Sequence, residues 1–251
     1  MSVIQSVDRA LSVLCQFNAQ VRYLGITELS QLLGLPKSTV HGLVKTLEAR
    51  GFLTQNPENG KYQLGVKVYE LGMVYSNTVE LQSAARNAAN RLAARYEEAV
   101  HLAIYVGGMV VYIMKTEFKG KLVAFPRVGA SIPAYATAVG KVLLAALPDS
   151  DIEKYREDEL YPFTSNTITS VEALRAELAK VREQGYAVDN EETLVGIACV
   201  GAPVFDRQGR VVAALSISGP ADKILGDCHS QLVKDVIQAA RETSRNLGYT
   251  V

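Results

Sequence analysis

A short helix, a glycine turn and a second helix, followed at once by a hairpin, are predicted within residues 27–64. Thr27 is a favourable N-cap for the first helix, and Gly34 ends it. Pro36 suits the first turn of the next helix, where its missing N–H would have no partner anyway. The apolar positions recur at three- and four-residue steps, and they are Leu29, Leu32 and Leu33, then Val40, Leu43, Val44 and Leu47. Helix, turn and helix in this spacing are typical of a helix-turn-helix.

Two short strands around an Asn-Gly turn follow the second helix. They are expected at residues 52–55 and 61–64, and a hairpin in this place is a wing. An amphipathic helix is predicted over residues 6–17, with Val7, Leu11, Leu14 and Cys15 as its apolar face. A further helix over residues 66–76 would connect this small domain to the remainder. The sequence therefore predicts a winged helix-turn-helix domain at 1–64, a linker at 65–81 and a second domain at 82–251.

The second domain alternates strands and helices. Strands are expected at 101–106, 109–114, 122–125, 197–205 and 210–218, with Gly107-Gly108 and residues 206–209 as tight connections. Helices are expected at 138–147, 151–160, 169–183 and 229–247. Antiparallel hairpins bordered by helices predict an α+β domain with a mostly antiparallel sheet rather than a doubly wound parallel sheet.

Composition limits the class of protein. The 251 residues suggest one or two domains, and 26 Lys and Arg against 26 Asp and Glu exclude a polycation or an acidic tail. Three widely spaced cysteines argue against a disulfide framework and point to a reducing cytoplasm. The longest apolar stretch, residues 194–205, is too short for a membrane span, and the first residues do not resemble a secretion signal.

The polar side of the predicted second helix is suited to DNA. Residues 36–47 contain no acid, and this side carries basic and small hydroxyl residues. Hydroxyls and N–H groups in a first turn favour a phosphate, whereas the middle of such a helix reads base edges. The predicted DNA-binding residues are Lys37, Ser38, Thr39, His41, Lys45 and, more weakly, Lys61 on the wing. The alternative is a three-helix unit with a solvated polar face.

Strand alternation groups three residues of the second domain. It places Cys199 on one face of its strand, and it places Ser216 and Ser218 opposite Leu215 and Ile217. Two hydroxyls and a thiol would then face one space. The alternative is an amphipathic strand with solvent-facing serines and a small core cysteine.

Several segments carry a resemblance to a known family. They are SVDRALSVL, ITELSQLLGLPKSTVHGLVKTLEARGFL, RVGASIPAYATAVGKVLLA, GYAVDNEE, GIACVGAPVFD and ALSISGP, in that order along the chain. The sequence resembles the IclR family of bacterial transcription regulators over essentially its whole length. The resemblance implies a winged helix-turn-helix, a linker helix and a GAF-like effector-binding domain. It also implies a homodimer or homotetramer on a palindromic operator.

Two positions depart from the family pattern. Gly42 stands where the family typically has Arg, and Tyr135 stands where many members have His. A glycine within a helix costs about 1 kcal/mol relative to alanine. At Gly42, both drift at a tolerant surface position and a closer approach of the helix to DNA remain open.

The resemblance also implies an effector pocket for a small carboxylic or oxo acid. Its predicted residues are Gly129 and Ala130, whose N–H groups would hold an anion, with Asp189, Cys199, Ser216 and Ser218 opposite. Asp189 would repel an anion unless it is protonated or accepts a hydrogen bond from a ligand hydroxyl, which favours a hydroxyl-bearing or hydrated oxo acid. A role of Asp189 in capping the loop 189–192 is equally open.

Catalytic and metal motifs are missing from the sequence. It contains no GxSxG or GxxxxGK[ST] segment, and His41, His101 and His229 have no metal-ligand spacing, so no enzyme activity, cofactor or metal is predicted. Cys199 with His101 as a base is a remote alternative.

We therefore expect a ligand-responsive regulator, by family resemblance a repressor of a catabolic operon. The alternative is a small-molecule enzyme or binding protein whose N-terminal helices only dimerise it.

The charge balance within the chain refines the DNA prediction. Residues 1–80 hold seven Lys and Arg against six Asp and Glu, so even this part is barely basic. Non-specific DNA affinity depends on phosphate contacts. We therefore expect it to be modest, and we expect operator binding to depend on dimerisation.

Overall fold

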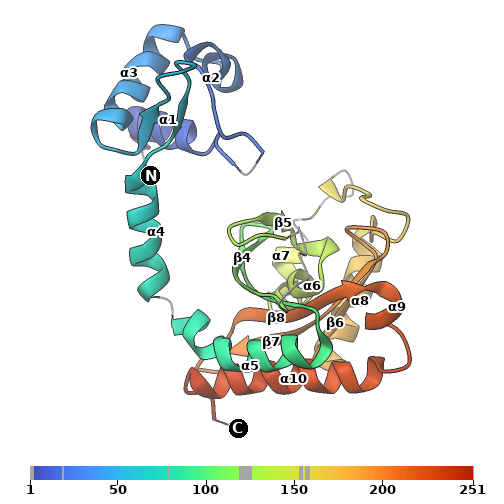
Figure 1. The fold of residues 1–251 in the computed structure, drawn as a ribbon. Coiled ribbons are helices and arrows are strands. Elements are labelled where there is room, and N and C mark those ends of the chain that lie inside the picture. Colours follow the sequence, from blue (N-terminus) through green and yellow to red (C-terminus); the bar gives the residue numbers. More distant parts are fainter. Residues whose placement is uncertain are drawn as a thin grey trace. The chain divides into compact units, whose positions relative to one another are not determined.

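The structure is a computed structural model that describes residues 3–18, 20–78, 80–118, 126–152, 155 and 159–250. The chain divides into two compact units, residues 1–79 and residues 80–251, which are taken separately below (Figure 1). The strand predicted at 122–125 lies outside the described residues, as does half of the helix predicted at 151–160.

The N-terminal unit has the predicted winged helix-turn-helix arrangement. Its helices and strands are α1 (Gln5–Leu14), α2 (Ile26–Leu33), α3 (Lys37–Ala49), β1 (Leu53–Gln55), β2 (Tyr62–Leu64) and α4 (Val66–Thr78). The two strands are antiparallel, with Thr54 opposite Gln63. Gly34 ends α2 in the left-handed conformation, at φ 63°, as a glycine at this position favours.

The start of α2 differs from the prediction. The N-cap is Gly25 rather than Thr27, because the Gly25 N–H donates to the Glu28 carboxylate at 2.6 Å and so fixes the start of the helix two residues earlier. The preceding residue, Leu24, exchanges backbone hydrogen bonds with Tyr62 of the wing. The wing is therefore tied to the entry of α2.

The side of α1 that is buried in the core of this unit differs from the predicted apolar face. Val13 of α1 is fully buried against α2 and α3, whereas Val7 and Leu11 are 52% and 57% exposed and Cys15 is exposed. The helix carries apolar residues on two sides, and the core of the N-terminal unit buries only one of these sides. Leu32 of α2 is likewise exposed, whereas Val40, Val44 and Leu47 of α3 are buried as predicted.

A six-stranded antiparallel sheet forms the centre of the C-terminal unit, which confirms the α+β prediction. The strands are β3 (Ala99–Val106), β4 (Met109–Thr116), β5 (Ser131–Pro133), β6 (Ala187–Asn190), β7 (Ile197–Phe205) and β8 (Val211–Pro220). Their order is β5-β4-β3-β8-β7-β6. Every pairing in the described part of this sheet is antiparallel.

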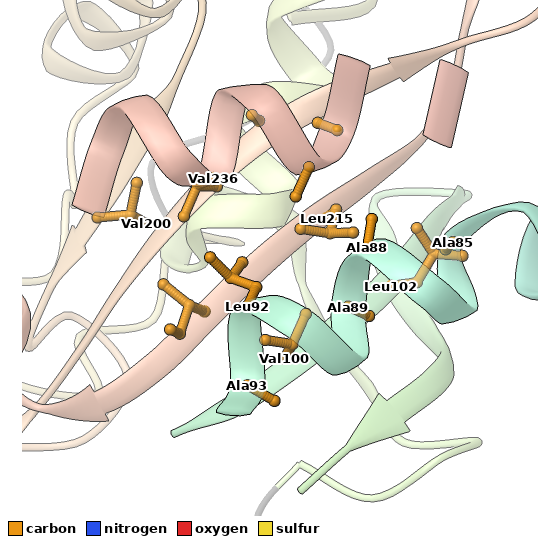
Figure 2. Packing of buried hydrophobic residues seen from close by; sticks show 14 of the residues in the cluster. Ala85, Ala88, Ala89, Leu92, Ala93, Val100, Leu102, Val200, Leu215 and Val236 are labelled. Atoms are coloured by element: carbon orange, nitrogen blue, oxygen red, sulfur yellow. The ribbon is translucent and has the colours of Figure 1, made fainter. Parts of the chain in front are cut away.

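Helices cover both faces of the sheet (Figure 1). On one face, α5 (Glu80–Tyr96) lies beside α10 (His229–Asn246). The small side chains Ala85 and Ala88 allow α5 to approach the sheet and α10 closely, as Figure 2 shows around Leu215 and Val236. The other face carries α6 (Ala138–Ala145) and α8 (Val171–Gln184). The remaining short helices are η1 (Ala134–Ala136), α7 (Asp149–Ile152) and α9 (Ala221–Ile224).

Candidate functional site

The exposed side of α3 brings together the predicted DNA-binding residues. Lys37, Ser38, His41 and Lys45 are exposed, and Thr39 is half-buried. The helix starts at Lys37 directly after its Pro36 N-cap, so the free backbone N–H groups of its first turn lie beside Ser38. The buried stripe and the polar side are thus separated on this helix as the sequence predicts.

The three lysines predicted to bind DNA differ in whether a carboxylate already pairs with them. Lys45 Nζ lies 2.8 Å from a Glu48 carboxylate oxygen, and Lys61 Nζ lies 2.7 Å from a Glu28 oxygen. The Lys61 ion pair also holds the pKa of the Glu28 carboxyl below its usual range. Lys37 has no carboxylate within ion-pair distance among the described residues. Its charge is therefore the most available to a phosphate.

Gly42 lies on the same exposed side of α3. A β-carbon added there would meet no atom within 4 Å, and its backbone carbonyl accepts a hydrogen bond from the Thr46 hydroxyl. No packing within the described N-terminal unit requires a glycine at this position.

The sheet register aligns the predicted effector residues on the face that carries α6. Asp189, Cys199 and Ser218 are direct cross-strand neighbours on β6, β7 and β8. In the next row, Gly201 on β7 is opposite Ser216, which is opposite His101 on β3. Because directly opposed residues share a face, four of the predicted side chains form one polar layer. His101 belongs to the same layer, although the sequence predicted only an ordinary strand residue there.

His101 is buried with one ring nitrogen unsatisfied. Its Nδ1 lies 3.4 Å from the Ser218 hydroxyl, whereas its Nε2 has no hydrogen-bond partner within the described structure. The ring packs edge-to-face against Tyr112, with centroids 5.5 Å apart. Burial lowers the pKa of His101 to about 3, and the nearby Lys115 contributes in the same direction. The imidazole is therefore neutral at physiological pH, and an unpaired buried nitrogen favours a partner such as a ligand or water.

Cys199 does not have the chemistry of a nucleophile. Desolvation of its sulfur raises the pKa of the thiol, and the neighbouring Asp189 raises it further. The thiol therefore stays protonated, whereas nucleophilic attack requires a thiolate. No hydrogen bond joins Cys199 to His101 in the described structure, and His101 Nδ1 lies beside the Ser218 hydroxyl, so the remote Cys199–His101 catalytic pair finds no support in the geometry.

Asp189 does what the loop-capping alternative predicts. It is 1% exposed, and its carboxylate accepts hydrogen bonds from the Glu192 backbone N–H at 2.7 Å and from the Thr193 hydroxyl at 3.1 Å. Burial raises the pKa of Asp189 to about 7, although the hydrogen bond from Glu192 opposes that change. A carboxyl group that is half protonated near neutral pH repels an anion less than an ionised one does.

A buried ion pair beside this layer was missed by sequence reasoning. Lys141 of α6 is 1% exposed, and its Nζ lies 2.6 Å from Glu192 and 3.2 Å from Glu177. The second carboxylate oxygen of Glu192 is buried and has no partner within the described structure. The only signal in the sequence is a lysine within the otherwise apolar run of residues 138–146. Such a residue needs a buried counter-charge if the helix is covered on all sides.

The structure differs from the prediction that the backbone N–H groups of Gly129 and Ala130 hold an anion. The Gly129 N–H donates to the Tyr112 carbonyl at 2.7 Å, and the Ala130 N–H donates to the Arg127 carbonyl at 2.9 Å. The Gly129 bond holds the segment against β4 and the Ala130 bond closes a local turn, so neither N–H is free to bind an anion in this conformation. The positive φ of Gly129, 84°, serves that turn.

Tyr135 is part of the core of the C-terminal unit. Its ring is 2% exposed, it stacks with Phe163, and its hydroxyl donates to the Tyr161 carbonyl at 2.9 Å. The residue fixes the segment that precedes Thr164 and Thr167, whose hydroxyls donate to the Glu191 and Glu192 carbonyls. Position 135 is therefore connected, through this segment, to the 189–192 loop beside the polar layer.

Replacing Asp189 with asparagine should change the pH dependence of stability. The native pKa is raised from 3.8 to about 7, so the folded protein binds a proton that the unfolded chain lacks between these values. The wild type therefore loses stability as pH rises from about 4 to 7, and Asp189→Asn does not share this loss. We expect near-equal stability at pH 4 and a variant more stable by about 1–2 kcal/mol at pH 8. Urea unfolding at both pH values measures the difference, and a variant that is less stable at pH 8 would contradict the raised pKa.

Searches of the described residues for two other kinds of site gave negative results. No group of three or more His, Cys, Asp or Glu residues in the described part of the chain is arranged to hold a metal ion. No helix among these residues combines the length and the apolar character needed to cross a membrane.

Comparison with known proteins identifies both units. Residues 6–57 match the IclR helix-turn-helix domain, and residues 73–245 match the C-terminal domain of the bacterial transcriptional regulator IclR. The HTH-type transcriptional regulator XynR of Escherichia coli (strain K12) is 42% identical over 250 residues, which cover 99% of each chain.

Solved structures agree with this result. The crystal structure of the IclR transcriptional regulator from Alicyclobacillus acidocaldarius is 29% identical, with a TM-score of 0.86 over 98% of this chain and 100% of the other. An IclR homologue from Microbacterium hydrocarbonoxydans, complexed with 4-hydroxybenzoate, is 25% identical, with a TM-score of 0.83 over 97% and 99% of the two chains.

A helix-turn-helix unit followed by an antiparallel-sheet effector unit defines a class of DNA-binding transcriptional regulators rather than enzymes. Within that class, the chain belongs to the IclR family of bacterial transcriptional regulators.

Proposed function

We propose that this protein is a repressor of a catabolic operon, and that it binds a palindromic operator as a dimer or a dimer of dimers under the control of a small organic acid. Residues 1–64 bind DNA, residues 65–81 link and help to dimerise the chains, and residues 82–251 bind the effector. The observation that carries this proposal is the pairing of an exposed α3 surface, whose residues 37–47 contain no acid, in one unit with a buried, incompletely satisfied polar layer in the other. An operator partner implies a cytoplasmic protein.

The DNA contact is assigned to the exposed side of α3. Lys37 and the free N–H groups of the first turn bind a phosphate, Ser38 and Thr39 add hydroxyl donors, and His41 reads the major groove from mid-helix. Lys45 and Lys61 contribute less, because each must first leave a carboxylate partner.

Alanine at position 37 should weaken operator binding and its dependence on salt. Lys37 has no competing ion pair among the described residues, so each lost phosphate contact should reduce the slope of log affinity against log salt by about 0.9. Lys45→Ala should reduce this slope less than Lys37→Ala does, and Lys61→Ala should reduce it least. Lys234→Ala, on α10 of the other unit, is the charge-matched control. Equal slopes for the wild type and Lys37→Ala in fluorescence anisotropy would contradict this docking.

The exposed apolar side of α1 supports dimerisation of the N-terminal units. Ile4, Val7 and Leu11 lie three and four residues apart on one side of the helix, and they are 68%, 52% and 57% exposed. No element of the described N-terminal unit covers this stripe. A second copy that packs the same stripe against it would form an isologous two-fold interface, which matches a palindromic operator.

The polar layer supports an effector with both acceptor and donor groups. The unpartnered His101 Nε2 is one candidate contact, and Ser216, Ser218, Cys199 and the Asp189 carboxyl lie in the same layer. The ligand of the Microbacterium relative, 4-hydroxybenzoate, has both a carboxylate and a hydroxyl. We propose a hydroxyl-bearing or hydrated oxo acid for this chain.

Loss of the Ser218 hydroxyl should weaken effector binding by about tenfold, because a buried hydrogen bond to the ligand or to His101 is removed. Calorimetry with small hydroxy acids measures the loss. Operator binding by the unliganded protein should stay intact, and Ser230→Ala at an exposed position of α10 serves as the control. Unchanged effector affinity in Ser218→Ala would place the pocket elsewhere.

The two sites are coupled by the relative affinity of the effector for two arrangements of the dimer. An effector that prefers one arrangement shifts the spacing of the two α3 helices, which must match half-sites one or more DNA turns apart. A coupling free energy of about 1–3 kcal/mol would change operator affinity about 5- to 150-fold.

A further inference from the structure

A cavity of about 640 Å³ lies at one edge of the sheet, and none of its described lining residues belongs to the polar layer. It is bounded by the C-terminal half of α10, the end of α8 and the second half of β7. The sheet leaves this space open because β6 starts at Ala187, opposite Gly201, so residues 202–205 of β7 have no neighbouring strand on that side among the described residues. Its volume is in the range of small-molecule sites.

Two arginines of α10 line this cavity without a counter-charge. Arg241 and Arg245 are exposed, and their guanidinium groups have no ion pair or hydrogen bond with any described residue. None of the described lining residues is acidic. On the other side of α10, by contrast, Arg91 pairs with Glu242 and Arg95 with Asp235. In a chain of zero net charge, this cavity therefore concentrates two positive charges.

The remaining walls combine amides with apolar surface. Gln184 and Gln238 supply amide groups, whereas Pro203 and Ile237 supply apolar contacts. Tyr249 stacks on Phe205 with ring centroids 5.0 Å apart, which fixes an aromatic wall. Such a lining fits a ligand with a short carbon skeleton between charged ends.

We propose that this cavity is a second ligand site, separate from the effector pocket, that binds a small organic dicarboxylate. Arg241 and Arg245 are one helical turn apart, about 6 Å along the axis, so each guanidinium binds one carboxylate as a two-point clamp. The carbon chain between the carboxylates lies against Pro203 and Ile237.

Calorimetry on the full-length chain at low salt tests this proposal with three probes. Succinate carries two carboxylates, propionate carries one, and inorganic phosphate is a dianion with a single centre. We expect saturable succinate binding, with propionate and phosphate at least about tenfold weaker. Arg241→Gln and Arg245→Gln should each weaken succinate binding by about tenfold, because each removes one charge-assisted contact.

Three further variants distinguish binding in this cavity from binding elsewhere on the protein. Arg86→Gln removes an exposed charge on α5 outside the cavity and should leave succinate affinity unchanged. Gln238→Trp fills the cavity without changing charge and should reduce binding. Ser218→Ala, in the effector pocket, should leave the succinate affinity unchanged.

Several results would overturn the proposal. They are the absence of saturable succinate binding, an equal loss in Arg86→Gln, phosphate binding tighter than succinate, or loss in Ser218→Ala with the two α10 variants unaffected. The last result would assign succinate to the effector pocket.

Discussion

Replacing Lys141 with methionine is expected to destabilise the C-terminal unit by about 3–5 kcal/mol. The ammonium group is buried, and it neutralises Glu192 at 2.6 Å and Glu177 at 3.2 Å. Without it, Glu192 is left as a buried carboxylate whose second oxygen already lacks a partner in the described structure. The cost is the desolvation of an uncompensated charge rather than the loss of one attractive contact. Urea unfolding of the full chain measures the change.

A second substitution separates this cause from a packing defect. In Lys141→Met/Glu192→Leu the buried charge is removed together with its partner, so a large part of the lost stability should return. Lys180→Met is the matched control, because its side chain is 71% exposed and its Nζ is 4.0 Å from Glu177. It should change stability by less than about 1 kcal/mol. A double variant no more stable than Lys141→Met would show that packing, rather than charge, dominates.

Leu11→Asp on α1 is expected to lower operator affinity by about 100-fold or more. The side chain is 57% exposed at the C-terminal end of the apolar stripe formed with Ile4 and Val7. A carboxylate in a two-fold interface would face its own copy and would also be desolvated, so the N-terminal units should separate. A single unit then loses the gain from binding two half-sites at once, which is worth about 10²- to 10⁴-fold.

The measurement combines sedimentation with an operator mobility shift. Val106→Asp is the control, because it also replaces an apolar side chain with a carboxylate, at a 52% exposed position of the C-terminal unit. Circular dichroism should show that Leu11→Asp keeps its helices, since Leu11 lies outside the core around Val13. A dimeric Leu11→Asp with wild-type operator affinity would rule out α1 as the dimer surface.

The helix-turn-helix could be predicted because its signals are local. Gly34 ends α2 and Pro36 precedes α3, and the buried side of α3 follows the helical period. The face of α1 could not be predicted in the same way. Val7, Leu11 and Val13 are all apolar, so periodicity alone does not decide which side the core of one chain covers and which side is left for a second copy.

The candidate effector site could be predicted only in part. Strand alternation is local, so the shared face of Ser216 and Ser218 follows from the sequence. The place of His101 in the same layer depends on the order of β3 and β8 in the sheet, which joins residues far apart in the chain. The Lys141–Glu192 pair likewise joins α6 to a distant loop. The hydrogen bonds that occupy the Gly129 and Ala130 N–H groups depend on the path of the loop against β4.

Whether the exposed side of α3 reads an operator is tested most directly by recovering bound fragments from sheared genomic DNA of the protein's own organism and footprinting them. The fragments should share a sequence with two symmetric half-sites whose centres lie about 10–10.5 base pairs, or a multiple of that, apart. Lys37→Ala/His41→Ala should lose this enrichment. Fragments with no common sequence, or equal enrichment by the double variant, would rule out sequence-specific reading by α3.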